Sequence, residues 1–162
     1  MFKKIILTLL VILVLVQLIP RPAKNMAAGL NPQDISNRYA VPADIDAILK
    51  DSCNDCHSNN THYPWYSRIQ PVAWWLGDHI REGKRGINFS EFLSYPLRKQ
   101  YHKLEEVEEM VESGEMPLKS YSLVHTKSKL NEQQKAALIG WTKAVRTQME
   151  AAYPMDSLVR KK

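Results

Sequence analysis

The chain has 162 residues, of which 44% are hydrophobic and 24% charged, and its 22 Lys and Arg against 17 Asp and Glu give a formal net charge of +5. These values describe one folded domain with a small addition, exclude a wholly disordered or collagen-like chain, and give no indication of nucleic-acid binding. The sequence has two cysteines, Cys53 and Cys56, which excludes a scaffold held by several disulfides and a metal site with four thiolate ligands.

An apolar segment, residues 5–19, follows Lys3 and Lys4 at the start of the chain. As a helix its fifteen residues would span about 22 Å, which is short of the roughly 30 Å hydrocarbon core of a bilayer and is typical of a signal peptide. The next residues are 20–22, Pro-Arg-Pro, rather than a small-residue cleavage site, and this favours an uncleaved anchor. We therefore expect residues 1–19 to be a signal peptide or an inner-membrane anchor, with the rest of the chain exported to the periplasm.

Residues 20–41 contain three prolines and no apolar periodicity, so we expect a linker, with the Ala27–Ala28–Gly29 stretch as the nearest small-residue cleavage site. The folded domain is expected at residues 42–153, beginning near Pro42 as the first residue of a helix. Residues 154–162 end in Arg160–Lys161–Lys162 and are expected to form a frayed basic tail.

Four amphipathic helices are predicted by apolar residues three and four positions apart. The second is expected to run from Pro71 to Gly83, the third to stop at Gly114, and the fourth to open with a helix-cap pair, Asn131 and Gln134. No segment alternates at period two and no Asn-Gly or Asp-Gly turn occurs, so the predicted fold class is all-α, a small cytochrome c-like helical domain. The expected buried stripes are Ile45, Ile48 and Leu49; Val72, Trp75, Leu76, His79 and Ile80; Leu97, Tyr101, Leu104, Val107 or Glu108, and Val111; and Leu138, Trp141, Val145 and Met149.

The first helix leads to Cys53-Asn54-Asp55-Cys56-His57, and C-x-x-C-H is the attachment signature of c-type haem. Two thiols three positions apart on a helical turn reach the two vinyl groups of one porphyrin edge, and the next imidazole lies against the iron. The covalent cofactor also supplies core to a domain of this size. The sequence therefore predicts one covalent haem c on Cys53 and Cys56, with His57 as an iron ligand.

Two other arrangements of the same residues stay open at this point. A disulfide between Cys53 and Cys56 would suit an exported protein, although the sequence lacks the βαβ pattern of thioredoxin-like proteins. A zinc site made of Cys53, Cys56, His57 and His62 has four nominal ligands but lacks the long spacer between a cysteine pair and a histidine pair.

Met116 is the candidate for the second axial ligand. It lies in residues 114–117, Gly-Glu-Met-Pro, directly after the expected end of the third helix, where the proline makes a rigid loop that presents the thioether. The order of the C-x-x-C-H motif, the methionine loop and a final helix is that of the Met/His cytochromes c. A role as an ordinary core residue also stays open for Met116.

His79 and His125 are the alternative ligands, the first on an apolar helix stripe and the second in a polar loop. His62 follows His57 too closely to reach the opposite face of the haem readily. His102 stands beside Lys103 on an expected solvent-facing side of the third helix.

The surroundings of the motif give three further expectations. A backbone carbonyl near Pro64 or Pro71 accepts a hydrogen bond from the Nδ1–H of His57. Asn54 and Asp55 face solvent near the haem edge. Five aromatic residues either pack against the haem or belong to the ordinary core, namely Tyr63, Trp65, Tyr66, Trp74 and Trp75.

A longer pattern surrounds the motif. It includes Cys53-Asn-Asp-Cys-His57, Thr61-His-Tyr63-Pro-Trp65-Tyr66, Ile69-Gln-Pro71-Val72, Trp74-Trp75-Leu76, His79-Ile80, Glu82-Gly83-Lys84, Asn88-Phe89-Ser90-Glu91, Gly114-Glu115-Met116-Pro117 and Trp141. Over about residues 40–150 it resembles the bacterial haem-binding domain family of exported monohaem proteins. The resemblance implies a c-type haem on Cys53 and Cys56, with His57 and Met116 as its axial ligands.

These features predict an exported monohaem c-type cytochrome that transfers single electrons and is not an enzyme, because two strong axial ligands leave no site for oxygen or peroxide. The expected partners are redox proteins of the cell envelope and, through residues 5–19, the membrane. The alternative is a haem-dependent peroxidase or a gas or redox sensor with an open or displaceable sixth position. That alternative lacks an obvious distal acid–base pair in the sequence.

Overall fold

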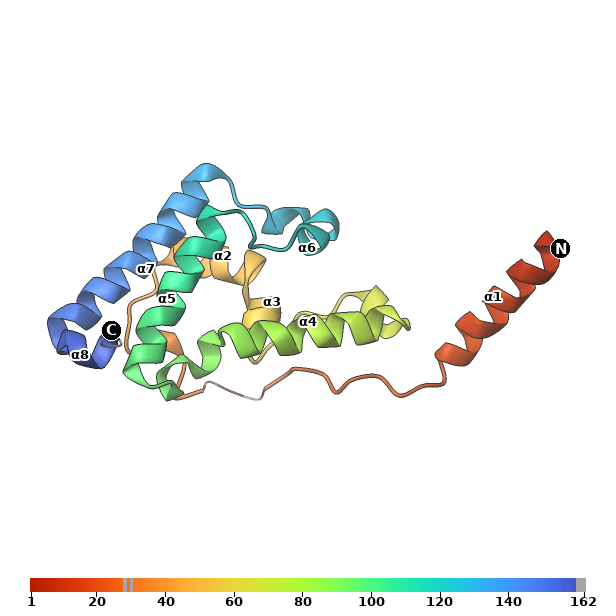
Figure 1. Cartoon of the computed structure of the whole chain (residues 1–162), viewed down its shortest axis with the longest axis horizontal. Helices are drawn as coiled ribbons and strands as arrows, with labels where there is room; N and C mark the ends of the chain where they lie inside the picture. The colour runs from red at the N-terminus through yellow and green to blue at the C-terminus, as the bar shows by residue number, and fades with distance from the viewer. Residues whose placement is uncertain (28, 30, 160–162) are drawn as a thin grey trace.

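The computed structural model describes residues 1–27, 29 and 31–159, which form helices and connecting segments without a strand (Figure 1). The all-α prediction is confirmed. Ala28 and the basic end, Arg160–Lys161–Lys162, lie outside the described residues. The α-helices are α1 (Phe2–Val16), α2 (Ala43–Ser52), α3 (Asn54–His57), α4 (Val72–Gly86), α5 (Leu97–Glu112), α6 (Lys119–Val124), α7 (Glu132–Ala152) and α8 (Met155–Leu158), and the short 3₁₀ helices are η1 (Ile35–Asn37), η2 (Trp65–Arg68), η3 (Phe89–Ser94) and η4 (Thr126–Ser128).

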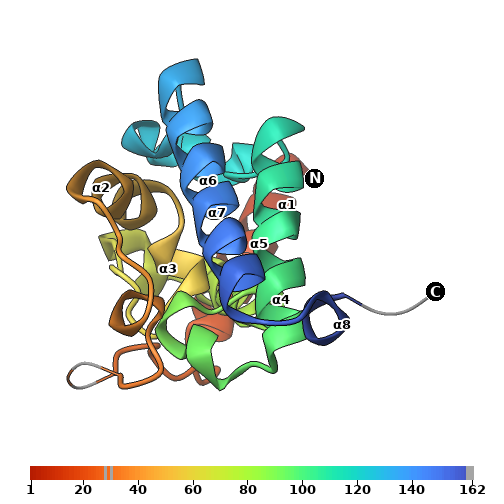
Figure 2. The same ribbon diagram turned by 90° about the vertical axis from the view of Figure 1, so that its left-hand side faces the viewer.

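Helices α5 and α7 lie side by side (Figures 1 and 2). Their predicted stripes are buried, except that Leu97 at the start of α5 is only partly buried. Burying each large aliphatic side chain contributes about 1.5–3 kcal/mol. The predicted cap of α7 is also present, because the Asn131 side chain accepts from the Gln134 N–H and the Gln134 side chain accepts from the Asn131 N–H. The most buried apolar residues of this pair are Leu104, Val111, Leu138, Val145 and Met149.

Residues 155–159, expected to be part of a frayed tail, pack on the domain. Helix α8 contacts α5 and α7, and its Leu158 is only 1% exposed. Arg98 of α5 donates a hydrogen bond to the backbone carbonyl of Asp156 at 3.0 Å. A single helical turn has little stability alone, so the buried leucine is what holds α8 in place.

The segment expected to be a linker, residues 20–41, has no α-helix among its described residues, but it contacts the domain. Ile35 and Tyr39 belong to the hydrophobic core. Asn25 donates side-chain hydrogen bonds to the Ser58 carbonyl at 2.8 Å and to Thr61 Oγ1 at 3.0 Å. These contacts attach the segment beside the C-x-x-C-H motif.

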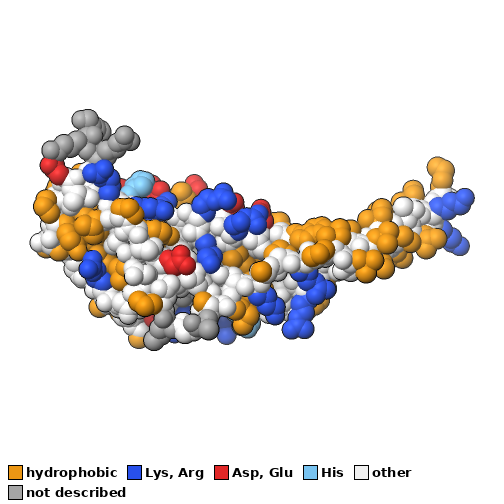
Figure 3. Space-filling view, turned by 90° about the horizontal axis from the view of Figure 1, so that it is seen from below, with side chains coloured by type: hydrophobic (Ala, Val, Ile, Leu, Met, Phe, Trp, Pro, Cys, Tyr) orange, Lys and Arg blue, Asp and Glu red, His pale blue; other side chains and the backbone are white. Residues whose placement is uncertain are grey.

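Helix α1 extends away from the domain, and Figure 3 shows apolar side chains along its whole length. It has no buried residue, which excludes a core helix. The residue after its end, Gln17, contacts the domain, because its side chain donates to the Gln70 carbonyl and accepts from the Gln70 N–H, both at 2.9 Å. None of the helices formed by residues 1–27, 29 and 31–159 is long and apolar enough to cross a membrane.

Candidate functional site

The C-x-x-C-H motif forms one helical turn between α2 and α4. Cys53 ends α2 and precedes α3, and its carbonyl accepts hydrogen bonds from the backbone N–H groups of Cys56 at 3.1 Å and His57 at 2.9 Å. Both cysteines are free thiols, so the disulfide alternative is not formed. This turn places the first thiol at the start of α3 and the second thiol and the imidazole at its end, one helical turn apart.

Helix α4 lies against α3 at Gly83. A Cβ atom at this position would stand 2.7 Å from the Cys56 carbonyl oxygen and 2.9 Å from the Cys56 Cβ, so only glycine permits the approach. The sequence predicted Gly83 as the end of this helix, and that is wrong, since α4 continues to Gly86. Gly83 is a helix-contact position beside the thiol-bearing turn.

The longer α4 also places the hydrogen-bond partner of His57. The Nδ1 atom of His57 lies 3.1 Å from the backbone carbonyl oxygen of Ile87, the residue directly after α4. The expected carbonyls near Pro64 or Pro71 are therefore wrong. A carbonyl only accepts, so Nδ1 carries the proton and Nε2 is left as the metal-binding nitrogen. Burial lowers the pKa of His57, which keeps the imidazole neutral at neutral pH.

Two adjoining cavities, of about 220 and 330 Å³, lie beside this turn. Both are lined by Cys53, His57 and Met116, while Cys56 lines the second alone. The structure thus brings the four predicted site residues to two neighbouring cavities that share Cys53, His57 and Met116. The remaining walls of the first cavity are mainly apolar and include Ile87, Phe89, Val107, Met110, Val111, Leu130 and Leu138.

These residues fit a c-type haem. Its flat hydrocarbon ring matches the apolar walls of the first cavity, its iron takes the unprotonated Nε2 of His57 and a thioether, and its vinyl groups take two reduced thiols. Burial, with the nearby Cys56, raises the pKa of the Cys53 thiol to about 12, and burial with Asp55 raises that of Cys56 to about 11. Both thiols are therefore protonated at neutral pH, which slows their oxidation to a disulfide.

The loop that carries Met116 is fixed at both ends. Gly114 has a φ of +73°, a left-handed conformation that glycine adopts without strain, and it ends α5 as predicted. The Met116 N–H then donates to the Met110 carbonyl at 3.0 Å. On the far side of the loop, the Tyr121 hydroxyl of α6 donates to Asp55 Oδ2 at 2.7 Å. The methionine loop is thereby attached to the residue between the two cysteines.

Asp55 is consequently not the solvent-facing residue that the sequence predicts. Its second oxygen accepts from the His62 N–H at 2.7 Å. Burial and the Asp55 carboxylate raise the pKa of Tyr121, so the phenol stays protonated and remains a donor. Asn54 is partly buried as well, and its Oδ1 atom has no hydrogen-bond partner among the described residues.

The alternative histidine ligands lie in different places. His79 lines the second cavity, and its Nδ1 lies 2.9 Å from the Trp75 carbonyl. His125 lines neither of the two cavities around His57; it stacks on Tyr121 with ring centroids 4.3 Å apart, and its Nε2 lies 2.5 Å from the Tyr66 hydroxyl.

The five aromatic residues that follow the motif line neither cavity, and Trp65 is 75% exposed. Trp75, expected in a buried stripe, is also exposed. The walls come instead from residues that the sequence reading did not assign to the site, above all on α5. Their signal was present, because Lys103, Glu106, Val107, Met110 and Val111 follow the helical spacing of one face.

No group of three or more His, Cys, Asp or Glu side chains among the described residues is arranged to hold a metal ion. In comparison with known proteins, the family model described as a haem-binding domain matches residues 11–144, which is most of the chain. This match confirms the resemblance that the motif pattern indicated. No curated protein and no solved structure matches the chain.

Proposed function

We propose that this chain, which belongs to the haem-binding domain family, carries one covalent haem c and transfers single electrons. The observation that supports this proposal is the pair of adjoining cavities whose walls together include Cys53, Cys56, His57 and Met116. When bound there, haem iron supplies one-electron chemistry by alternating between its ferric and ferrous states.

The chain's own residues would hold that group with little rearrangement. Cys53 and Cys56 supply the thiols for two thioether bonds. His57 is oriented by the Ile87 carbonyl, and the Met116 loop is fixed by Gly114 and by the Tyr121–Asp55 hydrogen bond. Fixed ligands on both sides suit electron transfer, because the protein reorganises little when the charge changes.

A peroxidase or a gas or redox sensor is the second candidate. The observation in its favour is His79, which lines the second cavity together with Met116 and stands beside Asp78 and Glu82 of the same cavity. In such a protein Met116 would be displaced, and His79 would act on a ligand of the iron.

For its location we propose export to the periplasm, with α1 as a signal peptide or as an anchor to the inner membrane, and redox proteins of the cell envelope as partners. The support is the run of exposed apolar side chains on α1, which follows Lys3 and Lys4. Fractionation of the expressing cells tests the location, and the mass of the purified chain shows whether α1 has been removed. A cytoplasmic protein with an intact N-terminus would contradict this proposal.

The cofactor and the ligands are tested together in cells that mature c-type cytochromes. We expect the wild-type protein to keep a haem stain on a denaturing gel and its oxidised form to show the sulfur-to-iron charge-transfer band in the red. Met116→Ala should keep the stain and lose that band. Met110→Ala is the matched control, because Met110 lines the same cavity but belongs to α5, and it should keep both.

Each contradictory result has a distinct meaning. An unstained wild-type protein refutes covalent haem. A charge-transfer band that survives Met116→Ala refutes the second ligand. Rapid binding of carbon monoxide to the reduced wild-type protein favours the sensor or peroxidase over the electron carrier.

A further inference from the structure

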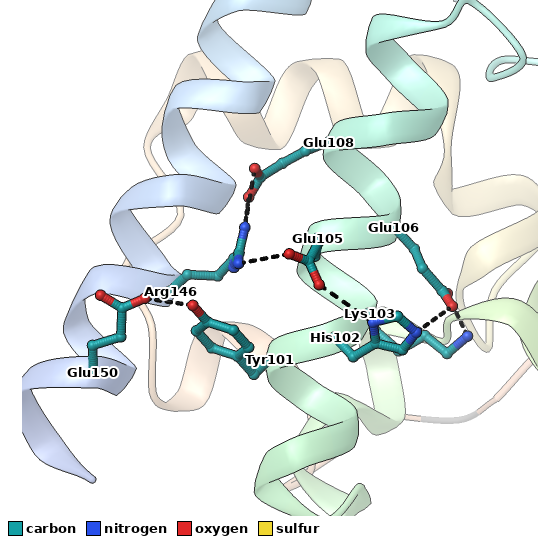
Figure 4. Close-up of polar contacts among 8 residues, drawn as sticks. All are labelled: Tyr101, His102, Lys103, Glu105, Glu106, Glu108, Arg146 and Glu150. Atoms are coloured by element: carbon teal, nitrogen blue, oxygen red, sulfur yellow. Dashed lines mark hydrogen bonds and ion pairs between the residues drawn. The ribbon is translucent and has the colours of Figure 1, made fainter. Parts of the chain in front are cut away.

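Lys103 places a positive charge at the edge of the first cavity. It is the one Lys or Arg among the described residues that line either cavity. Its side chain is only 16% exposed and pairs with Glu106, at 2.5 Å between Nζ and Oε2. Figure 4 shows both side chains on the side of α5 that faces away from α7. The sequence placed Lys103 on a solvent-facing side, and the structure corrects this.

The second cavity carries the opposite charge. The second cavity is lined by three carboxylates, Asp55, Asp78 and Glu82, and by no Lys or Arg among the described residues. Cys56 lines that second cavity only, whereas Lys103 lines the first only. The cation and the second thiol therefore border different cavities, which share Cys53, His57 and Met116 as lining residues.

The two sides of a haem also differ in charge. Its two vinyl groups lie on one side of the porphyrin and its two propionate carboxylates on the other. Thioether bonds to Cys53 and Cys56 hold the vinyl side, so the carboxylates point away from the cysteines. Carboxylates directed at Asp78 and Glu82 would be repelled, whereas an ammonium group attracts them, most strongly where the site excludes water.

We propose that the Lys103 ammonium binds a propionate carboxylate of the haem and so fixes which side of the ring faces α5. This inference rests on the proposed function. An ammonium group has three N–H donors, and Glu106 is the one side-chain partner that Lys103 has among the described residues, so donors remain for a second carboxylate.

Glu106 is the counter-ion of Lys103 in this arrangement. Its side chain is 35% exposed and is also 3.1 Å from His102 Nε2 on the solvent side of the helix. Glu106 can therefore keep its solvent contacts while Lys103 lies between two carboxylates. This interaction is charge-assisted and partly shielded from water, which makes it stronger than a surface ion pair.

The experiment compares three holoprotein variants after haem staining has shown that each carries the cofactor. In Lys103→Met the cation is lost, in Lys103→Arg it is kept, and in Lys143→Met the same charge is removed from an exposed position on α7. We expect Lys103→Met to lower the reduction potential, because losing a nearby cation favours ferric iron. The propionate bending band in the resonance Raman spectrum should shift in the same variant.

Lys103→Arg should keep the potential and the Raman band close to those of the wild-type protein, and Lys143→Met should change neither. Equal potentials and unshifted Raman bands in Lys103→Met and Lys143→Met would overturn the assignment of Lys103, while the haem stain would still support the proposed function. A wild-type protein without covalent haem would refute both.

Discussion

The two sides of helix α5 differ in what they contact. On the side that faces α7, side chains fill the interface, and Arg146 of α7 contacts Glu105 at 3.0 Å and Glu108 at 3.2 Å (Figure 4). The Tyr101 hydroxyl adds a hydrogen bond to Glu150. On the side that faces α3 and the Met116 loop, the same helix borders an apolar cavity.

This difference shows where the domain depends on a cofactor. The α5–α7 side is closed by amino acids alone and has a continuous hydrophobic core. The side with α3, α4 and α6 leaves apolar surface around Cys53, His57 and Met116 that a large flat group would cover. We expect loss of haem to affect the second side far more than the first.

The largest effect is expected from His57→Ala. It removes the proposed axial ligand and the hydrogen bond to Ile87, so the holoprotein should fail to assemble and the cavity should stay open. Hydrogen exchange on the chain that accumulates should be fast in α3 and α4 and slow in α5 and α7. His62→Ala, at an exposed position outside both cavities, is the control and should assemble normally. Uniformly fast exchange in all four helices would contradict the comparison.

Arg146→Met acts on the opposite side of α5. Glu108 is only 8% exposed, and its carboxylate would be left without its cation, which destabilises the domain by about 3 kcal/mol. Urea unfolding measures this loss, while the oxidised haem spectrum should not change. Lys50→Met breaks the exposed pair with Asp46 and should cost less than about 1 kcal/mol. An altered haem spectrum in Arg146→Met would show that the two sides are coupled.

The sequence predicted the α5–α7 side well because regular helices and their ends have local sequence signals. Apolar residues three and four positions apart marked both helices, Gly114 marked the end of α5, and the Asn131–Gln134 pair marked the start of α7. Each signal is local and needs no knowledge of what the helix packs against.

The other side was predicted only at the residues whose chemistry has a fixed spacing. The C-x-x-C-H turn and the Met116 loop lie together as expected. The sequence did not indicate the hydrogen-bond partner of His57, because Ile87 is thirty residues away along the chain. Ile87 lies near His57 because α4 continues past Gly83 to Gly86. The role of Lys103 was missed because helical spacing places it on one face with Val107 and Met110 but does not tell whether that face borders a cavity or solvent.

Gly83→Ala tests the contact that the sequence could not show. Alanine favours a helix by about 1 kcal/mol, but its Cβ would meet the backbone of Cys56, and overpacking costs about 1–3 kcal/mol. We expect a net loss of about 1 kcal/mol and a lower yield of attached haem. Gly140→Ala is the matched control, since nothing lies within 4 Å of its added Cβ, and it should stabilise α7. Equal stability of the two variants would mean that α4 can shift away from Cys56 without a loss in the free energy of unfolding.

The smallest effect is expected from Tyr121→Phe, which removes the hydrogen bond between α6 and Asp55 and leaves the packing of the ring in place. Such a bond contributes about 1 kcal/mol, so Met116 should be displaced by an added imidazole about fivefold more readily, with the haem still attached. Tyr153→Phe, which loses an exposed hydrogen bond to Arg38 far from the cavity, should bind imidazole like the wild-type protein. The expected difference would mean that Tyr121, which is not one of the proposed ligands, helps to hold the Met116 loop. Equal imidazole affinities in the two variants would instead show that Gly114 and Pro117 hold this loop without Tyr121.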